Sequence, residues 1–327
     1  MLDLTDRHCR YFHRLLSKNA RLYTEMVTTG ALIHGDQPRH LDFSAEEHPI
    51  ALQLGGSDTK ELAYCASLAQ KWGYDEVNLN CGCPSERVQK GSFGACLMQD
   101  PALVADCVKA MQDACDVPVT IKHRIGIDAI EEYGFVQNFV GTLYDAGVRV
   151  FIVHTRNAWL KGLSPKENRE IPPLRREVAY QLKKDFPDAV IVINGAIPDL
   201  GVAEEQLEHV DGVMLGRSAY YTPWILSDVD SRIYGDNLDE PVTREKVIEG
   251  MTRYIVEKEP DFRALRATCR HMHGLLTGLA GAKTWRRILS EAATIEMMGN
   301  EILHYAYGKA GWADVADPLM PDEFRDY

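Results

Sequence analysis

The alternation of short apolar runs with amphipathic stretches constrains the fold of this chain more than any other feature. Between residues 22 and 217, seven runs rich in valine and isoleucine are separated by longer segments of helical periodicity. Near-continuous apolar runs are typical of parallel strands buried on both faces, and parallel neighbours need crossover helices. The predicted strands are residues 22–27, 50–55, 76–81, 117–124, 148–155, 189–196 and 212–217. The predicted helices between them include residues 60–72, 101–114, 130–146 and 174–186.

This element order predicts an α/β fold of the TIM (β/α)8 barrel type. A closed barrel of that type needs eight strands, whereas the sequence offers seven. The chain opens directly on a helical stretch, residues 5–17, with Thr5 or Asp6 as its N-cap. We therefore expect the first strand to lie before Met1, in a natural N-terminus further upstream. The alternative is a barrel that is open at one seam, with two exposed strand edges.

The pattern turns helical without strands after the last predicted strand. A helix over residues 223–234 is expected to complete the barrel layer, and helices over 243–257, 262–279 and 282–293 follow. We predict a barrel domain over residues 1–238 and a small all-helical domain over 239–327.

A local excess of basic residues falls in the predicted helical domain. The whole chain has a net charge of −12, which argues against attraction of nucleic acid to the surface at large. Residues 261–290, however, carry six basic residues and one acid. This basic segment predicts a local RNA-binding patch, and a solvated helical face is the alternative interpretation.

Composition and cysteine spacing exclude several other classes of protein. The sequence has no apolar run long enough for a membrane helix, and it does not begin as a signal peptide does. Eight scattered cysteines predict reduced thiols in a cytoplasmic protein. Cys81 and Cys83 form a C-x-C pair without a second pair, so we expect no metal site.

Polar side chains stand at the ends of the predicted strands, where barrel enzymes place their active sites. They are Gln53, Asn78, Asn80, Lys122, Arg124, His154, Arg156, Asn194 and Arg217. Asn194-Gly195 and Gly216-Arg217 follow the last two strands, where barrels commonly bind a phosphate. Glycine allows backbone N–H groups to approach an anion closely, and Arg217 adds a charge-assisted bond. Two ordinary βα turns remain the alternative interpretation.

A second group of side chains suits a planar ring system at the same end of the barrel. Lys122 can stabilise negative charge on a reduced ring, His154 can donate to a ring carbonyl, and Gln53 offers a donor and an acceptor. A flavin has such edges. Cys83 lies in a tight Gly-Cys-Pro loop, where a protonated thiol can act as a general acid.

Several motifs together resemble those of the tRNA-dihydrouridine synthases. They are Asn78-Leu79-Asn80-Cys81-Gly82-Cys83-Pro84-Ser85, Gly94-Ala95-Cys96-Leu97, Ala51-Leu52-Gln53-Leu54-Gly55-Gly56, Thr120-Ile121-Lys122-His123-Arg124, Val153-His154-Thr155-Arg156, Ile193-Asn194-Gly195 and Gly212-Val213-Met214-Leu215-Gly216-Arg217. The stretch from Leu163 to Leu174 resembles the A subfamily, as do Trp285-Arg286-Arg287 and Arg270-His271-Met272. The resemblance covers residues 1 to about 292.

The resemblance implies an NADPH-dependent enzyme with FMN that reduces uridine 20 or 20a in the D-loop of tRNA to 5,6-dihydrouridine. A hydride would pass from FMN to C6 of uracil, and Cys83 would give the proton to C5. Residues implied to hold the flavin are Met1, Gln53, Lys122, His154, Asn194, Gly195, Ala196, Gly216 and Arg217. Residues implied to contact tRNA are Asn80, Lys166, Arg169, Lys283, Arg286 and Arg287. A monomer is expected.

The chain departs from the family pattern in three places. The strand that usually ends in Ala-Pro-Met is absent before Met1, Ala196 stands where a second glycine is usual, and the tail after about Ala293 does not match. Alanine at position 196 is tolerable only if its φ is negative. Two other functions stay open: an FMN barrel that reduces a free pyrimidine, and a tRNA-binding module without activity.

Overall fold

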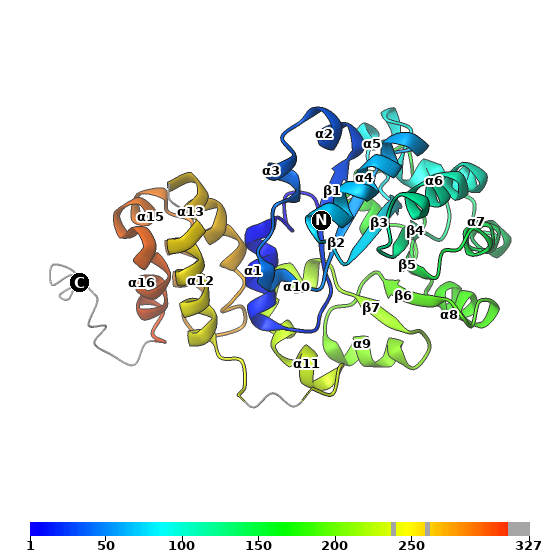
Figure 1. Ribbon diagram of the computed structural model, residues 1–327. Coiled ribbons are helices and arrows are strands. Elements are labelled where there is room, and N and C mark those ends of the chain that lie inside the picture. Colours follow the sequence, from blue (N-terminus) through cyan, green and yellow to red (C-terminus); the bar gives the residue numbers. More distant parts are fainter. Residues whose placement is uncertain (237–239, 259–261, 313–327) are drawn as a thin grey trace.

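Seven parallel strands form one sheet in the computed structural model, which describes residues 1–236, 240–258 and 262–312 (Figure 1). The strand order is β1-β2-β3-β4-β5-β6-β7, so each strand pairs with its neighbours in the sequence. The strands are β1 (Leu22–Thr28), β2 (Ile50–Gly55), β3 (Glu76–Cys81), β4 (Val119–Arg124), β5 (Val150–His154), β6 (Val190–Asn194) and β7 (Gly212–Met214). Parallel strands in this order, with helices outside them, confirm the predicted barrel class. β1 and β7 are not paired with each other among the described residues, so the sheet is an incomplete barrel.

Helices follow most strands and cover the outside of the sheet. Those of the barrel part are α1 (Arg7–Leu16), α2 (Thr29–His34), α3 (Gln37–Leu41), α4 (Thr59–Trp72), α5 (Glu86–Lys90), α6 (Pro101–Ala114), α7 (Tyr133–Asp145), α8 (Arg176–Asp185), α9 (Leu200–Leu207), α10 (Arg217–Tyr221) and α11 (Val229–Arg232). Their ends follow local chemistry. Asp58 caps α4 by accepting from the N–H groups of Lys60 and Glu61, and Gly73 ends it with a φ of 86°.

The C-terminal region is helical, as predicted, although two of its predicted helices are broken. Its helices are α12 (Arg244–Lys258), α13 (Phe262–Cys269), α14 (Ala282–Ile288), α15 (Ala292–Met298) and α16 (Ile302–Lys309). The predicted helix 262–279 was wrong beyond Cys269: a short 3-10 helix, Arg270–Met272, follows α13, and Gly278, with a φ of 86°, could not continue a helix. The helix predicted at 282–293 ends at Ile288. The predicted boundary at 238/239 and the tail from residue 313 lie outside the described residues.

The molecule has two apolar cores. The larger core lies between the sheet and its outer helices α4, α6, α7 and α8. The second core lies under the helical region, but Phe12 and Leu16 of α1 and Ala219 of α10 belong to it as well. Figure 1 accordingly shows α1 between α12 and α13 on one side and the barrel on the other. The helical region therefore shares its core with the first helix of the chain.

Asp6 links α1 to the helical region through hydrogen bonds and an ion pair. Its Oδ1 accepts from the N–H groups of His8 and Cys9 and so caps α1, while Oδ2 accepts from Arg270 at 2.8 Å and His271 at 2.9 Å. Burial by itself raises the pKa of Asp6, but the hydrogen bond and charge of His271 outweigh it and hold the pKa far below its usual range. The ionised carboxylate is therefore the form that the folded protein favours.

Asp6→Asn is expected to lower the free energy of unfolding by roughly 2–3 kcal/mol at pH 7, because Asn still caps α1 but loses the charge that Arg270 and His271 face. Since the folded pKa of Asp6 is depressed, this contribution is present above about pH 4 and is lost as the pH falls further. Urea unfolding of both proteins at pH 7 and pH 3 measures it. Asp36→Asn, at the exposed cap of α3, is the control, and an equal loss at both pH values would contradict the ionic role.

Among the described residues, none of the helices has the length and apolar character that crossing a membrane requires.

Candidate active site

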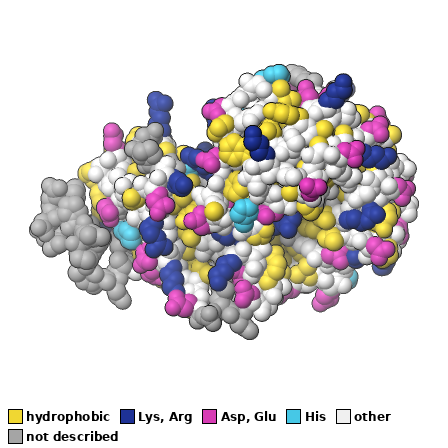
Figure 2. Space-filling model, in the orientation of Figure 1, with side chains coloured by type: hydrophobic (Ala, Val, Ile, Leu, Met, Phe, Trp, Pro, Cys, Tyr) yellow, Lys and Arg dark blue, Asp and Glu magenta, His cyan; other side chains and the backbone are white. Residues whose placement is uncertain are grey.

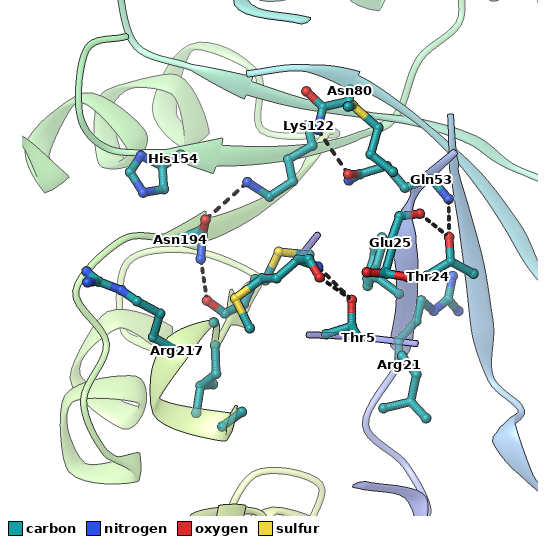
Figure 3. Close-up of a pocket in the computed structure, with 18 of the residues that line it drawn as sticks. Thr5, Arg21, Thr24, Glu25, Gln53, Asn80, Lys122, His154, Asn194 and Arg217 are labelled. Carbon is teal, nitrogen blue, oxygen red and sulfur yellow. Dashed lines mark hydrogen bonds between the residues drawn. The ribbon is translucent and has the colours of Figure 1, made fainter. Parts of the chain in front are cut away.

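A large cavity runs through the inside of the incomplete barrel and reaches the carboxyl ends of the strands. Its volume is about 1720 Å³, and all nine residues expected to hold a flavin line it, as do Asn80, Cys83, Arg124 and Arg169. Of the expected tRNA contacts, Lys166 and the three basic residues of α14 do not line the cavity. Figure 3 shows Lys122, His154, Asn194 and Arg217 on one side of it, with Gln53 opposite.

Strand register brings the polar side chains of one wall together. Arg124 of β4 is the partner of His154 in β5, and His154 is the partner of Asn194 in β6. The Nζ of Lys122 donates to the Oδ1 of Asn194 at 3.1 Å, and the Nδ2 of Asn194 donates to the carbonyl of Met214 at 2.7 Å. Asn194 therefore connects Lys122 to the end of β7, the strand that precedes the Gly216 turn.

Positive charge dominates this wall. Burial, together with the charge of the neighbouring Arg124, lowers the pKa of Lys122 to about 7. Burial also holds the pKa of His154 well below its ordinary value, with the charges of Arg124 and Lys122 acting in the same direction. The Nδ1 of His154 is buried and has no hydrogen-bond partner among the described residues. A buried, unsatisfied polar atom in a cationic cavity indicates a polar or anionic ligand.

The Cys83 loop is held by Asn80. The Oδ1 of Asn80 accepts from the backbone N–H groups of Gly82 at 3.0 Å and Cys83 at 2.9 Å. The Cys83 side chain is half-buried at the cavity, with its Sγ 3.6 Å from the Oγ of Ser85. All eight cysteines are free, and Cys81 is fully buried. Among the described residues, no cluster of three or more His, Cys, Asp or Glu side chains is arranged to hold a metal ion.

Sequence reasoning missed the structural part that Arg124 plays. Arg124 is 5% exposed, and its guanidinium donates to the carbonyls of Gly82 at 3.1 Å, Asn157 at 3.3 Å and Asn168 at 3.0 Å. Arg124 thus joins the Cys83 loop to two segments that follow β5. Its place beside Lys122 at a strand end was visible in the sequence. The three carbonyls, however, belong to residues 33 to 44 positions away in the sequence, so they gave no local signal.

The last two strand ends differ from expectation. β7 ends at Met214, and Gly216 is the N-cap of the short helix α10, so Gly216-Arg217 begins a helix rather than ending a strand. Arg217 is paired with Glu170 at 2.5 Å. Gly195 has a φ of 124°, and a Cβ there would lie 3.0 Å from the Oγ1 of Thr155. The two turns lie side by side at the cavity.

A family model described as "Dihydrouridine synthase (Dus)" matches residues 1–307. This chain belongs to the dihydrouridine synthase family. Members of the dihydrouridine synthase family are flavin-dependent oxidoreductases that reduce uridine in tRNA to dihydrouridine, which confirms the resemblance drawn from the motifs.

Curated relatives are similar to the chain over most of its length. The tRNA-dihydrouridine(20/20a) synthase of Salmonella typhimurium is 57% identical over 296 residues, covering 90% of this chain and 88% of the relative. The enzyme of the same name from Vibrio vulnificus is 53% identical, covering 94% of each chain. Among solved structures, morphinone reductase has a similar fold, with a TM-score of 0.51 at 13% identity, covering 75% of this chain and 85% of that one.

The residues present suit the flavin of the dihydrouridine synthase family. The unsatisfied Nδ1 of His154 and the ammonium of Lys122 lie in one cavity with Gln53, and these are groups that a ring with carbonyl and nitrogen edges can satisfy. The glycine turns at 195 and 216 lie in the same cavity.

Ala196 departs from the family pattern at a structural cost. Its φ is 49°, so the condition for a tolerable alanine, a negative φ, is not met. An L-residue in the left-handed region costs about 1 kcal/mol relative to glycine.

Ala196→Gly is therefore expected to raise the free energy of unfolding by about 1 kcal/mol, because it relieves this strain and removes a Cβ beside the cavity. Chemical denaturation measures the gain. Ala203→Gly, inside helix α9, is the control and should lose stability instead. A loss of stability in Ala196→Gly would show that the strain is smaller than the entropy that glycine adds to the unfolded chain.

Proposed function

We propose that this protein reduces uridine 20 or 20a in the D-loop of tRNA to 5,6-dihydrouridine, with FMN as its flavin and NADPH as electron donor. The observation that carries the proposal is the position of Cys83, half-buried at a cationic cavity that the nine expected flavin-binding residues line. The names of the relatives from Salmonella and Vibrio support the choice of positions 20 and 20a.

The flavin-binding role rests on charge and hydrogen bonding. When bound, reduced FMN supplies the hydride for C6 of uracil. Lys122 would favour an anionic ring, since a bound negative charge compensates the burial that lowers the pKa of this lysine. His154 stays neutral because burial and nearby cations disfavour its charged form, so it keeps one donor and one acceptor for the ring. The turns at Gly195-Ala196 and Gly216-Arg217 would hold the phosphate.

Cys83 would complete the reduction from the other side of the uracil. Adding hydride at C6 leaves electron density at C5, which must take up a proton. The Cys83 thiol would donate that proton, and the hydrogen bonds that the N–H groups of Gly82 and Cys83 donate to Asn80 would hold the loop in place.

The tRNA must present the uridine out of its stack, because the reacting groups lie inside a cavity. Asn80 and Arg169 line the cavity and would contact the nucleotide, while Lys166 and the α14 residues Lys283, Arg286 and Arg287 would contact the backbone around it. All three α14 side chains are exposed, although Arg287 is paired with Glu291 at 2.7 Å. On the face in Figure 2, acidic and basic side chains are interspersed. We expect a cytoplasmic monomer.

The direct experiment is to incubate unmodified tRNA with the protein, FMN and NADPH, and to locate dihydrouridine by mass spectrometry of digested fragments. Dihydrouridine at position 20 or 20a is the expected result. Reduction of free uridine in place of tRNA would favour the free-pyrimidine barrel. A protein that binds tRNA but forms no dihydrouridine would favour the binding module.

A further inference from the structure

A continuous chain of hydrogen bonds runs inside the barrel from the start of β3 to the Cys83 loop. Thr120 donates to Glu76 at 2.6 Å, Asn78 donates to Thr120 at 2.8 Å, and Gln53 donates to Asn78 at 2.9 Å. Asn80 donates to Gln53 at 2.9 Å and accepts from the N–H groups of Gly82 and Cys83. Figure 3 shows Asn80 and Gln53 next to each other. We call these five side chains the polar relay.

Strand register explains why the relay is continuous. Gln53 of β2 is the partner of Asn78 in β3, and Asn78 is the partner of Thr120 in β4. Glu76, Asn78 and Asn80 alternate along β3 and so share one face of the sheet, whereas Val77 and Leu79 belong to the outer apolar core. The five relay side chains are at most 9% exposed, so water does not compete freely for their bonds.

The groups at its two ends give the relay a single direction. A backbone N–H can only donate, and an ionised carboxylate can only accept. Thr120 must therefore donate its one proton to Glu76, so that its oxygen accepts from the amide nitrogen of Asn78. The Oδ1 of Asn78 is then the atom that accepts from Gln53, and the Oε1 of Gln53 is the atom that accepts from Asn80.

Glu76 is itself fixed as an acceptor. Besides Thr120, its carboxylate accepts from the hydroxyl of Tyr23 at 2.8 Å and pairs with the guanidinium of Arg21 at 2.5 Å. The Glu76 side chain is 3% exposed. Burial, followed by the charge of Glu76, raises the pKa of Tyr23 far above its ordinary value, so the tyrosine remains a donor.

From this geometry we propose that Glu76 and Thr120 are positioning residues for the reaction: they set which atoms Gln53 and Asn80 present to the cavity and how Asn80 holds the Cys83 loop. The proposal rests on the proposed function. Asn80 uses its oxygen for two N–H groups, so it offers a ligand one N–H and no acceptor. Without the hydroxyl of Thr120, the side-chain amides of Asn78 and Gln53 can flip and exchange the positions of their oxygen and nitrogen atoms. Asn80 then no longer holds the Cys83 loop in a single position.

Thr120→Val tests the relay, because valine keeps the shape of threonine and removes the hydroxyl, while Thr120→Ser keeps the hydroxyl. We expect Thr120→Val to bind FMN and oxidise NADPH but to reduce tRNA about tenfold more slowly in a single turnover, the effect of one hydrogen bond. The visible absorption band of the bound flavin should shift. Thr120→Ser should restore both to near the wild-type values.

Alkylation of Cys83 tests the relay independently of the rate of tRNA reduction. The rate at which iodoacetamide alkylates Cys83, followed by peptide mass spectrometry, reports the placement of the loop. We expect it to change at least threefold in Thr120→Val and to return in Thr120→Ser. If Thr120→Val does not fold, Glu76→Gln replaces it, because an amide at that position no longer imposes a direction.

The outcomes separate the two proposals. Wild-type rates, spectra and alkylation in Thr120→Val would overturn the relay, as would a Thr120→Ser variant as impaired as Thr120→Val. If wild-type protein forms no dihydrouridine while alkylation of Cys83 still differs between the valine and serine variants, the proposed function fails and the relay stands.

Discussion

Cys83→Ala is expected to slow dihydrouridine formation in tRNA by roughly 10²- to 10⁴-fold, the usual contribution of a positioned general acid. The physical reason is that carbon C5 of uracil must take up a proton inside a cavity, and Cys83 is the half-buried thiol at that cavity. FMN binding and NADPH oxidation should be unchanged, because the thiol is not among the groups proposed to hold the flavin. Single-turnover assays with reduced enzyme and unmodified tRNA measure the loss.

A matched control is Cys96→Ala. Cys96 is also only partly buried, but its thiol donates to the carbonyl of Phe93 at 3.0 Å and does not line the cavity. This variant should reduce tRNA at the wild-type rate. Wild-type activity in Cys83→Ala would mean that the proton comes from another group, and equal losses in both variants would point to damaged packing.

Lys122→Met should have opposite effects on the two states of the protein. The flavin-free variant is expected to gain a few kcal/mol of stability at pH 7, because it no longer buries an ammonium group in the folded state. The same variant is expected to bind FMN at least tenfold more weakly, because it has lost the cation that faces the ring.

The pH dependence gives the sharper test of Lys122. Its pKa in the folded protein is about 7, below the ordinary value of 10.5, so the unfolded chain binds more protons between these two values. Stability of the flavin-free protein should therefore rise with pH across that window, and Lys122→Met should lose part of this rise. Urea unfolding at pH 6, 7, 8 and 9 measures it, with Lys109→Met on the exposed face of α6 as control. A flavin-free Lys122→Met less stable than wild type at pH 7 would contradict the burial argument.

The sequence predicted the barrel strands well because buried parallel strands carry a periodic signal. β2 and β3 begin and end where predicted, at Ile50–Gly55 and Glu76–Cys81. The helices that follow β1, α2 and α3, were not predicted, since these short helices are set by local caps such as Thr28 and Asp36 rather than by a long apolar stripe.

Part of the candidate site was likewise predictable from the sequence, and part was not. Most of the expected flavin residues stand in or just after the barrel strands, so their meeting at one cavity followed from topology, whereas Met1 lies before α1. The relay from Glu76 through Thr120 did not follow, because its bonds join three strands and depend on register. The positive φ of Ala196 was likewise invisible, since backbone conformation at a single alanine has no sequence pattern.

The core that α1 shares with the helical region has a consequence for making hybrid enzymes. Phe12 and Leu16 lie in the same apolar cluster as Trp285, although the full length of the barrel separates them in sequence. A helical region transplanted from a relative would meet a foreign α1 and would leave mismatched apolar surface at the graft. Recombination between relatives should therefore succeed when α1 and the C-terminal helices come from the same parent protein.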